Sequence, residues 1–173
     1  MRVVYLKPCE YYYGDRPVRV ITVLGSCVAV TMYHRPSGLA AICHLVAPDC
    51  TISKGCTSEC TQMGRYVNCM IPAMATSFAT HGIRPAELEV KLFGGASMLD
   101  SGGRDNAQES LGEINTAMAR KLLRQYGLTI KCADVGGHQG RKIIFDTRSG
   151  DVLLKRILPV SSLPEERFQQ PRL

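Results

Sequence analysis

Long apolar runs are missing from this sequence of 173 residues, since none approaches the ~20 consecutive residues that a membrane-spanning helix requires. The N-terminus also lacks the hydrophobic region and small-residue cleavage site of a signal peptide, which predicts a cytoplasmic protein. No Gly-x-Gly-x-x-Gly or Walker pattern is present, so the pairs Gly94-Gly95 and Gly136-Gly137 do not predict a nucleotide site. Lysines and arginines are scattered and do not alternate with aromatic residues. The net charge of +6 therefore does not indicate a nucleic-acid-binding groove.

Hydrophobic residues make up 45% of the sequence, which is enough for an ordinary globular core. The length favours a single domain over residues 1–160, followed by a polar tail over residues 161–173 that we expect to be flexible. Eight cysteines would suggest disulfides in a small secreted protein, but this chain is longer and shows no export signal. We therefore expect reduced thiols.

Strands are expected where β-branched and apolar residues lie between turn-forming residues. The ranges that meet this condition are 2–6, 18–23, 27–33, 38–45, 89–93, 129–133, 142–146 and 152–156. The last two are joined by residues 147–151, which are typical of a hairpin loop. Hairpins together with helices predict an α+β fold.

Two helices are expected from apolar residues at helical spacing. The first covers residues 65–79, where Pro72 predicts either a kink or a regular helix that begins only near Met70. The second is expected to have Asn115 as its N-terminal cap and Gly127 at its end. Its buried stripe is expected to contain Met118, Leu122 and Tyr126.

A thiol and an imidazole are predicted to meet where two apolar runs pair as a hairpin. Cys27 follows the turn-forming pair Gly25-Ser26, and His44 lies near the end of the second run. A four-residue loop over 34–37 places Cys27 directly opposite His44. The other pairs in this register are Tyr33 with Gly38, Met32 with Leu39, Val30 with Ala41 and Val28 with Cys43. Directly opposed residues have Cβ atoms about 4.5–5.5 Å apart, close enough for contact. A one-residue slip would separate the two faces.

This pair has the composition of a nucleophilic site. A thiol is a good nucleophile as thiolate, and His44 could act as base toward Cys27 and then as acid toward the leaving group. Thr22, on the preceding strand, is the candidate that orients the imidazole. Backbone N–H groups at Gly25 and Ser26 could stabilise an oxyanion. The alternative is structural, because a buried cysteine behaves as a small hydrophobic residue.

The sequence resembles the CheD family of chemoreceptor glutamine deamidases over nearly its whole length, from about Val18 to Ile157. The resemblance rests on Leu24-Gly25-Ser26-Cys27-Val28-Ala29-Val30, His44 with Pro48, Gly64-Arg65-Tyr66, Gly94-Gly95-Ala96-Ser97-Met98, Gly112 with Asn115, and Asp134-Val135-Gly136-Gly137. It implies a layered sandwich of mixed or antiparallel β-sheets with two main helices, similar to bacterial toxin-type cysteine deamidases.

The implied activity is hydrolysis of glutamine side-chain amides to glutamate on methyl-accepting chemotaxis receptors, with release of ammonia. By the family pattern Cys27 is the nucleophile that forms a thioester, and His44 is the general base and acid. Thr22 matches the family's threonine, although in some members that residue lies one position earlier, where this chain has Ile21. We expect no cofactor and no metal. The resemblance implies a CheC-type phosphatase as a possible further partner.

Two alternatives belong to other classes of protein. One is a non-catalytic adaptor that binds the receptor or the phosphatase without needing Cys27. The other is a zinc-stabilised module built on Cys50, Cys56, Cys60 and Cys69. Structural zinc sites favour paired Cys-x₂₋₄-Cys motifs, and only Cys56 and Cys60 come close to that spacing.

Overall fold

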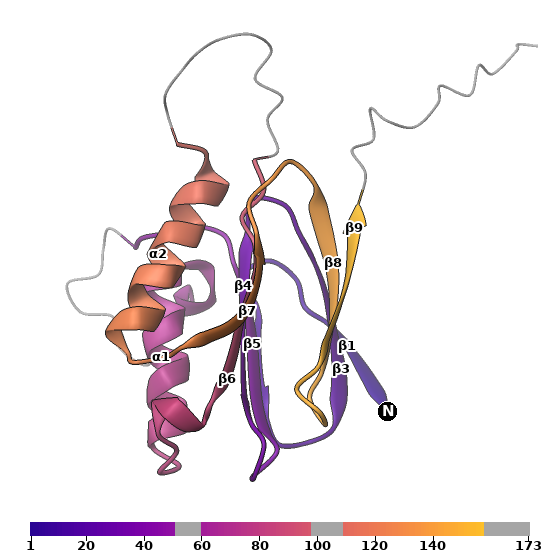
Figure 1. Cartoon of the computed structure of the whole chain (residues 1–173), viewed down its shortest axis with the longest axis vertical. Coiled ribbons are helices and arrows are strands. Elements are labelled where there is room, and N and C mark those ends of the chain that lie inside the picture. The colour runs from indigo at the N-terminus through magenta and orange to yellow at the C-terminus, as the bar shows by residue number, and fades with distance from the viewer. Residues whose placement is uncertain (51–59, 98–108, 158–173) are drawn as a thin grey trace, which may run out of the picture.

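The computed structural model describes residues 1–50, 60–97 and 109–157, which form three layers (Figure 1). The strands are β1 (Arg2–Tyr5), β2 (Tyr11–Gly14), β3 (Val18–Leu24), β4 (Val28–His34), β5 (Leu39–Leu45), β6 (Glu89–Gly94), β7 (Ile130–Val135), β8 (Gly140–Asp146) and β9 (Val152–Ile157). The helices are α1 (Val67–Ala79), α2 (Leu111–Gln125) and the short 3₁₀ turns η1 (Met63–Arg65) and η2 (Pro85–Glu87). None of these helices is long and apolar enough to cross a membrane. The predicted tail over residues 161–173 lies outside the described residues.

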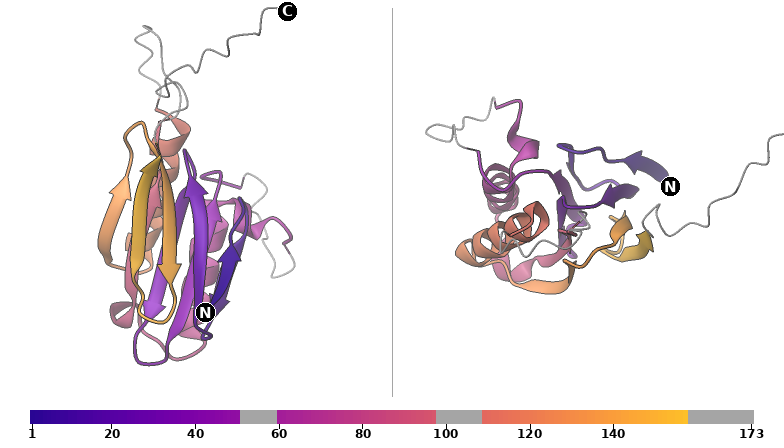
Figure 2. Two further views of the ribbon diagram at one scale, coloured as in Figure 1. Left: turned by 90° about the vertical axis from the view of Figure 1, so that its right-hand side faces the viewer. Right: turned by 90° about the horizontal axis from the view of Figure 1, so that it is seen from above.

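The strands form two sheets, of order β1-β3-β8-β9 and β2-β5-β4-β6-β7. Pairing is parallel between β1 and β3 and between β6 and β7, and antiparallel elsewhere. Both α-helices lie on one face of the five-stranded sheet, and the four-stranded sheet covers its other face (Figure 1). Figure 2 shows that no described helix covers the outer face of the four-stranded sheet. The predicted α+β sandwich with two main helices is confirmed.

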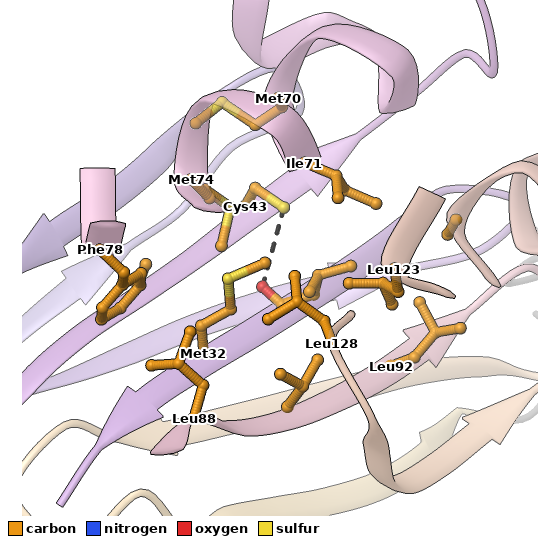
Figure 3. Close-up of a cluster of buried hydrophobic side chains, with 14 of the residues drawn as sticks. Met32, Cys43, Met70, Ile71, Met74, Phe78, Leu88, Leu92, Leu123 and Leu128 are labelled. Carbon is orange, nitrogen blue, oxygen red and sulfur yellow. Dashed lines mark hydrogen bonds between the residues drawn. The ribbon is translucent and has the colours of Figure 1, made fainter. Parts of the chain in front are cut away.

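The layers enclose two apolar cores, one on each face of the five-stranded sheet. The first lies between this sheet and the helices, and it includes Met32, Cys43, Met74 and Phe78 (Figure 3). The second lies between the two sheets. Because β4 and β5 contact both cores, almost every residue in them is buried. Their sequences therefore read as continuous apolar runs without the alternation of a half-exposed strand.

The β4–β5 hairpin is shifted by two residues from the predicted register. His34 pairs with Leu39, and His44 pairs with Ala29 in place of Cys27. The reason is Gly38, whose φ of 71° belongs to the turn, and whose N–H donates to the carbonyl of His34. A shift of two residues keeps each side chain on its predicted face. The thiol and the imidazole therefore remain on one face but are diagonal neighbours.

The first helix begins at Val67 and continues through Pro72 to Ala79, so the alternative start near Met70 is wrong. Its C-terminus matches the prediction, because Gly82 has a positive φ of 72° and its N–H donates to the carbonyl of Ala79.

The second helix is capped by Ser110, which corrects the assignment of Asn115 as the cap. The Ser110 hydroxyl accepts from the backbone N–H of Glu113, and the Glu113 carboxylate accepts from the backbone N–H of Ser110. Asn115 lies in the second turn and is buried. The fully buried positions are Gly112, Asn115, Ala119 and Leu123, so the predicted stripe of Met118, Leu122 and Tyr126 was displaced by one position. The helix ends before Gly127, as predicted.

Strand β2 was not predicted, because the tyrosine-rich segment before Gly14 carries no clear alternation. It pairs with β5 at the edge of the five-stranded sheet. Tyr13 packs edge-on against Phe78, with ring centroids 5.5 Å apart, and its hydroxyl donates to the carbonyl of Ser77. This edge strand brings the turn before it alongside the end of β5, where His44 lies.

Candidate active site

The turn between β3 and β4 carries Cys27 and is held by the residues that follow β6. The N–H of Ala96 donates to the carbonyl of Gly25, and the N–H of Gly95 donates to the carbonyl of Cys27, at 2.9 and 2.8 Å. Gly94 and Gly95 have φ values of 104° and 66°, a region that side chains with a Cβ rarely occupy. A Cβ on Gly94 would also clash with the Cys27 carbonyl. The Gly-Gly pair thus lets the backbone approach this turn closely.

The Cys27 thiol lies at the edge of the core between the two sheets, where it is half-buried. Burial raises its pKa, and the thiol of Cys9 adds a smaller effect in the same direction. The backbone N–H of Cys27 itself opposes both effects. We therefore expect the resting side chain to be a thiol.

The imidazole of His44 is buried, with 2% of the residue exposed, and is oriented by Thr22. Its Nδ1 lies 2.7 Å from the Thr22 hydroxyl, which itself lies 2.8 Å from the carbonyl of Leu6. The hydroxyl has a single hydrogen. When it donates this hydrogen to the carbonyl, it accepts a hydrogen bond from Nδ1–H. Nδ1 then carries the proton of the neutral ring, and Nε2 keeps its lone pair. Nε2 is buried and has no hydrogen-bond partner in the described part of the chain.

Burial lowers the pKa of His44, which keeps the imidazole neutral at physiological pH. The carbonyl of Leu6 and the carboxylate of Glu10 oppose this effect, because both stabilise an imidazolium. Both pKa shifts favour a neutral imidazole and a protonated thiol over a preformed thiolate–imidazolium pair.

The backbone of His44 is fixed by a turn that sequence analysis did not identify. The N–H of Cys9 donates to the His44 carbonyl at 2.9 Å, and the N–H of His44 donates to the Glu10 carbonyl at 3.0 Å. The turn closes by a hydrogen bond from the N–H of Glu10 to the carbonyl of Lys7. Cys9 has a φ of 69° and follows Pro8, as in a type II turn. Pro8, at the second position of this turn, is the sequence signal that indicates it.

Asn115 is a second residue whose place in the site was missed. Its side-chain amide donates to the carbonyl of Ser26 and to the carbonyl of Val46, both at 3.1 Å. Ser26 directly precedes Cys27, and Val46 lies two residues after His44. No sequence pattern marks this role, because it depends on how α2 packs against the ends of two strands.

The structure thus brings Thr22 and His44 into contact and leaves Cys27 next to them without a hydrogen bond to Nε2. Side chains in diagonal positions of an antiparallel pair lie about 7–8 Å apart or somewhat less. Catalytic hydrogen bonds are often long without substrate, so the missing contact does not exclude the pair. A half-buried thiol, an unpaired imidazole nitrogen and an orienting hydroxyl form a candidate site for thiol-dependent hydrolysis.

The alternative zinc site cannot be built from the described residues alone. Within residues 1–50, 60–97 and 109–157, no three His, Cys, Asp or Glu side chains are arranged to hold a metal ion. Cys56 lies outside these ranges, so the set of Cys50, Cys56, Cys60 and Cys69 stays a prediction.

Comparison with known proteins identifies the family. Residues 50–156 match the family model described as CheD, chemotactic sensory transduction. The chain is 44% identical over 154 residues to the probable chemoreceptor glutamine deamidase CheD 2 of Geobacter sulfurreducens, covering 89% of each. It is 39% identical over 158 residues to the probable chemoreceptor glutamine deamidase CheD of Maridesulfovibrio salexigens, covering 91% of this chain and 93% of that protein. The chain belongs to the CheD family.

Similarity to solved structures is lower. The hypothetical protein YfiH of Bacillus licheniformis aligns with a TM-score of 0.45 and 14% identity, over 72% of this chain and 49% of that one. The protein NMB0706 of Neisseria meningitidis aligns with a TM-score of 0.44 and 12% identity, over 79% of this chain and 63% of that one. The chain thus spans about half the length of the first structure.

Proposed function

We propose that this protein hydrolyses glutamine side-chain amides of methyl-accepting chemotaxis receptors to glutamate, through a thioester at Cys27. Relatives that share up to 44% of its residues are named probable chemoreceptor glutamine deamidases, which supports the reaction and the substrate class. The observation that carries the mechanism is the buried, unpaired Nε2 of His44 beside a half-buried thiol.

In the first half of the reaction, the sulfur of Cys27 attacks the amide carbon while its proton passes to Nε2 of His44. Thr22 accepts from Nδ1–H and keeps Nε2 directed at the reacting atoms. The oxyanion is stabilised by the backbone N–H groups of Gly25 and Ser26, in the turn that carries Cys27. His44 then gives the proton to the amide nitrogen, and ammonia leaves as the thioester forms.

In the second half, water attacks the thioester carbon and His44 accepts a proton from it. The carbon–sulfur bond breaks, the thiol of Cys27 regains a proton, and the carboxyl group of glutamate is released. One water is consumed and one ammonia is produced for each amide, so no cofactor is needed. Thr22 carries no charge, so the imidazolium formed in both halves is stabilised by the Leu6 carbonyl and by Glu10.

The substrate sites are on receptors, and we propose that the reaction takes place in the cytoplasm. A CheC-type phosphatase is the second partner that we propose, as a regulator that binds the deamidase. Binding of either partner without catalysis is the competing function, that of an adaptor. The two functions differ in whether Cys27 is needed.

The test is mass spectrometry of a purified cytoplasmic receptor fragment after incubation with the wild-type chain or with Cys27→Ala. Each converted glutamine adds ~1 Da to the fragment, as expected when an amide becomes an acid. We expect conversion by wild type, and a loss of at least about 10³-fold in rate for Cys27→Ala with receptor binding retained. Cys132→Ala, which removes an exposed thiol, is the matched control and should convert normally. Equal conversion by Cys27→Ala, or none by wild type, would contradict the proposal.

A further inference from the structure

Asn115 connects the two backbone segments that carry the proposed nucleophile and base. It is fully buried in the second turn of α2, on the side facing the five-stranded sheet. Its Nδ2 donates one hydrogen to the carbonyl of Ser26 and the other to the carbonyl of Val46, each at 3.1 Å. Ser26 directly precedes Cys27, and Val46 lies two residues after His44.

The strand ladder does not fix these two segments to each other. The last pair of the β4–β5 ladder is Val28 with Leu45, so Cys27 and Val46 lie just beyond it. The carbonyls of Ser26 and Val46 thus lie outside this ladder. Asn115 continues the connection where the ladder ends, using a planar group with two donors at a fixed spacing.

Other features of Asn115 argue against a role in the helix alone. Ser110 and Glu113 already cap α2, so no cap is required from Asn115. Asparagine is a poorer helix former than alanine or leucine, and its Oδ1 is buried without a partner among the described residues. Its two hydrogen bonds to the strand ends offset these costs.

We propose that Asn115 is a positioning residue of the site, which sets the spacing of the Cys27 turn relative to His44. The inference rests on the proposed deamidation by Cys27 and His44. In the diagonal register, the approach of the thiol to Nε2 depends on how far Ser26 lies from Val46. A shift of about 1 Å between reacting groups can cost about 10²-fold in rate.

The sharpest test is Asn115→Asp, which keeps the shape of the side chain and removes its paired donors. An ionised carboxylate would repel both carbonyls, whereas a protonated carboxyl can still donate one hydrogen bond. Burial favours the protonated form and raises the pKa of such a group, so the donor returns as the pH falls. We expect kcat for the receptor fragment to fall about 10²-fold near pH 8 with little change in KM. The ratio of variant to wild-type kcat should then rise at least about threefold near pH 6.

Gln125→Glu makes the same amide-to-acid change on the exposed last residue of α2 and is the matched control. Its kcat should remain within about twofold of wild type at both pH values. Asn115→Ser is a second variant, since serine offers one short donor that cannot span both carbonyls. It should also lower kcat more than KM is changed, without the recovery near pH 6. A folded Asn115→Asp or Asn115→Ser with wild-type kcat overturns the inference.

Alkylation of the resting protein separates this inference from the proposed function. The rate at which iodoacetamide modifies Cys27, relative to exposed Cys132 in the same sample, depends on the placement of Cys27 and His44 and needs no receptor. We expect Asn115→Asp to lower this relative rate near pH 8 and Gln125→Glu to leave it unchanged. An unchanged relative rate overturns the inference, even if wild type deamidates the receptor. A lowered rate supports it, even if another protein proves to be the substrate.

Discussion

Cys27 and Cys43 lie in the two different cores of this molecule, and they differ in how deeply the thiol is buried and in what lies beside it. Cys43 is fully buried between the five-stranded sheet and the helices, and its thiol lies 3.7 Å from the carbonyl of Val30 (Figure 3). Burial there raises the pKa of Cys43 to about 12. Cys27 is half-buried at the edge of the other core, beside an oriented imidazole.

The face of β5 on which a side chain lies, more than burial, decides which thiol shares a core with the imidazole. Cys43 and His44 are neighbours on β5, so their side chains point to opposite faces of the sheet. Cys43 therefore faces the helices, while His44 faces the four-stranded sheet together with Cys27. A thiol can be close to the histidine in sequence and still be unable to reach it.

Removal of the imidazole should abolish most of the reactivity that distinguishes Cys27 from Cys43. We expect His44→Gln to lower kcat for the receptor fragment by about 10²- to 10⁴-fold, because the variant lacks the proposed general base. Wild-type kcat/KM should hold as the pH falls to about 6.5 and decline only below it, since burial lowers the pKa of His44. The pH–rate profile of His44→Gln should lack this acid limb. A profile with the same limb in the variant would assign it to another group.

Removal of the orienting hydroxyl should have a smaller effect. We expect Thr22→Val to lower kcat by roughly 10- to 100-fold, because Nδ1–H loses its acceptor and the ring is free to turn. Thr22→Ser restores the hydroxyl and should recover most of the rate. Thr31→Val is the matched control, because Thr31 is a buried threonine on neighbouring β4. Equal rates for Thr22→Val and Thr31→Val would contradict an orienting role for Thr22.

Removal of the other thiol should change stability at alkaline pH and leave catalysis intact. The folded protein keeps the proton of Cys43 up to about 12, while the unfolded chain loses it near the usual thiol pKa. The stability that this group contributes is thus present below that usual value and lost as the pH rises above it, by up to about 1.4 kcal/mol per pH unit. The free energy of unfolding of Cys43→Ala, measured in urea, should fall less steeply with rising alkaline pH than that of wild type. Near neutral pH the substitution should lower this free energy by about 1–2 kcal/mol.

Tyr12 and Tyr13 also have raised pKa values, so the measurement is the difference between Cys43→Ala and wild type at each pH. Cys132→Ala, which lacks an exposed thiol, is the control for the loss of a cysteine as such. If the free energy of unfolding depends on alkaline pH equally in wild type and Cys43→Ala, the core between the five-stranded sheet and the helices does not raise the pKa of Cys43.

The periodic elements of the fold could be predicted from the sequence, and their junctions could not. Both helices and eight of the nine described strands follow from apolar spacing and from glycine or proline at their ends. The hairpin register was wrong by two residues because Gly38 belongs to the turn. The Ser-x-x-Glu pattern at Ser110 is a capping-box signal, and it marks the start of α2 better than Asn115 does.

In the candidate site, too, the features set by local sequence could be predicted and those set by tertiary contacts could not. Cys27, His44 and Thr22 could be chosen from the turn before Cys27 and from the strands on either side of it, and Thr22 does contact His44. The two hydrogen bonds of Asn115 and those of the turn at Cys9 join segments that lie up to 89 positions apart in the chain. Such contacts have no local signature in one sequence.

The most direct test of this account measures the modification of Cys27 and Cys43 in one sample, together with the remaining deamidase activity. The folded protein is treated with limiting iodoacetamide, each cysteine is quantified by peptide mass, and glutamine conversion is assayed on the same receptor fragment. The account predicts that activity falls in proportion to modification at Cys27, while Cys43 remains unmodified until the protein unfolds. Activity that persists when Cys27 is fully modified would contradict it.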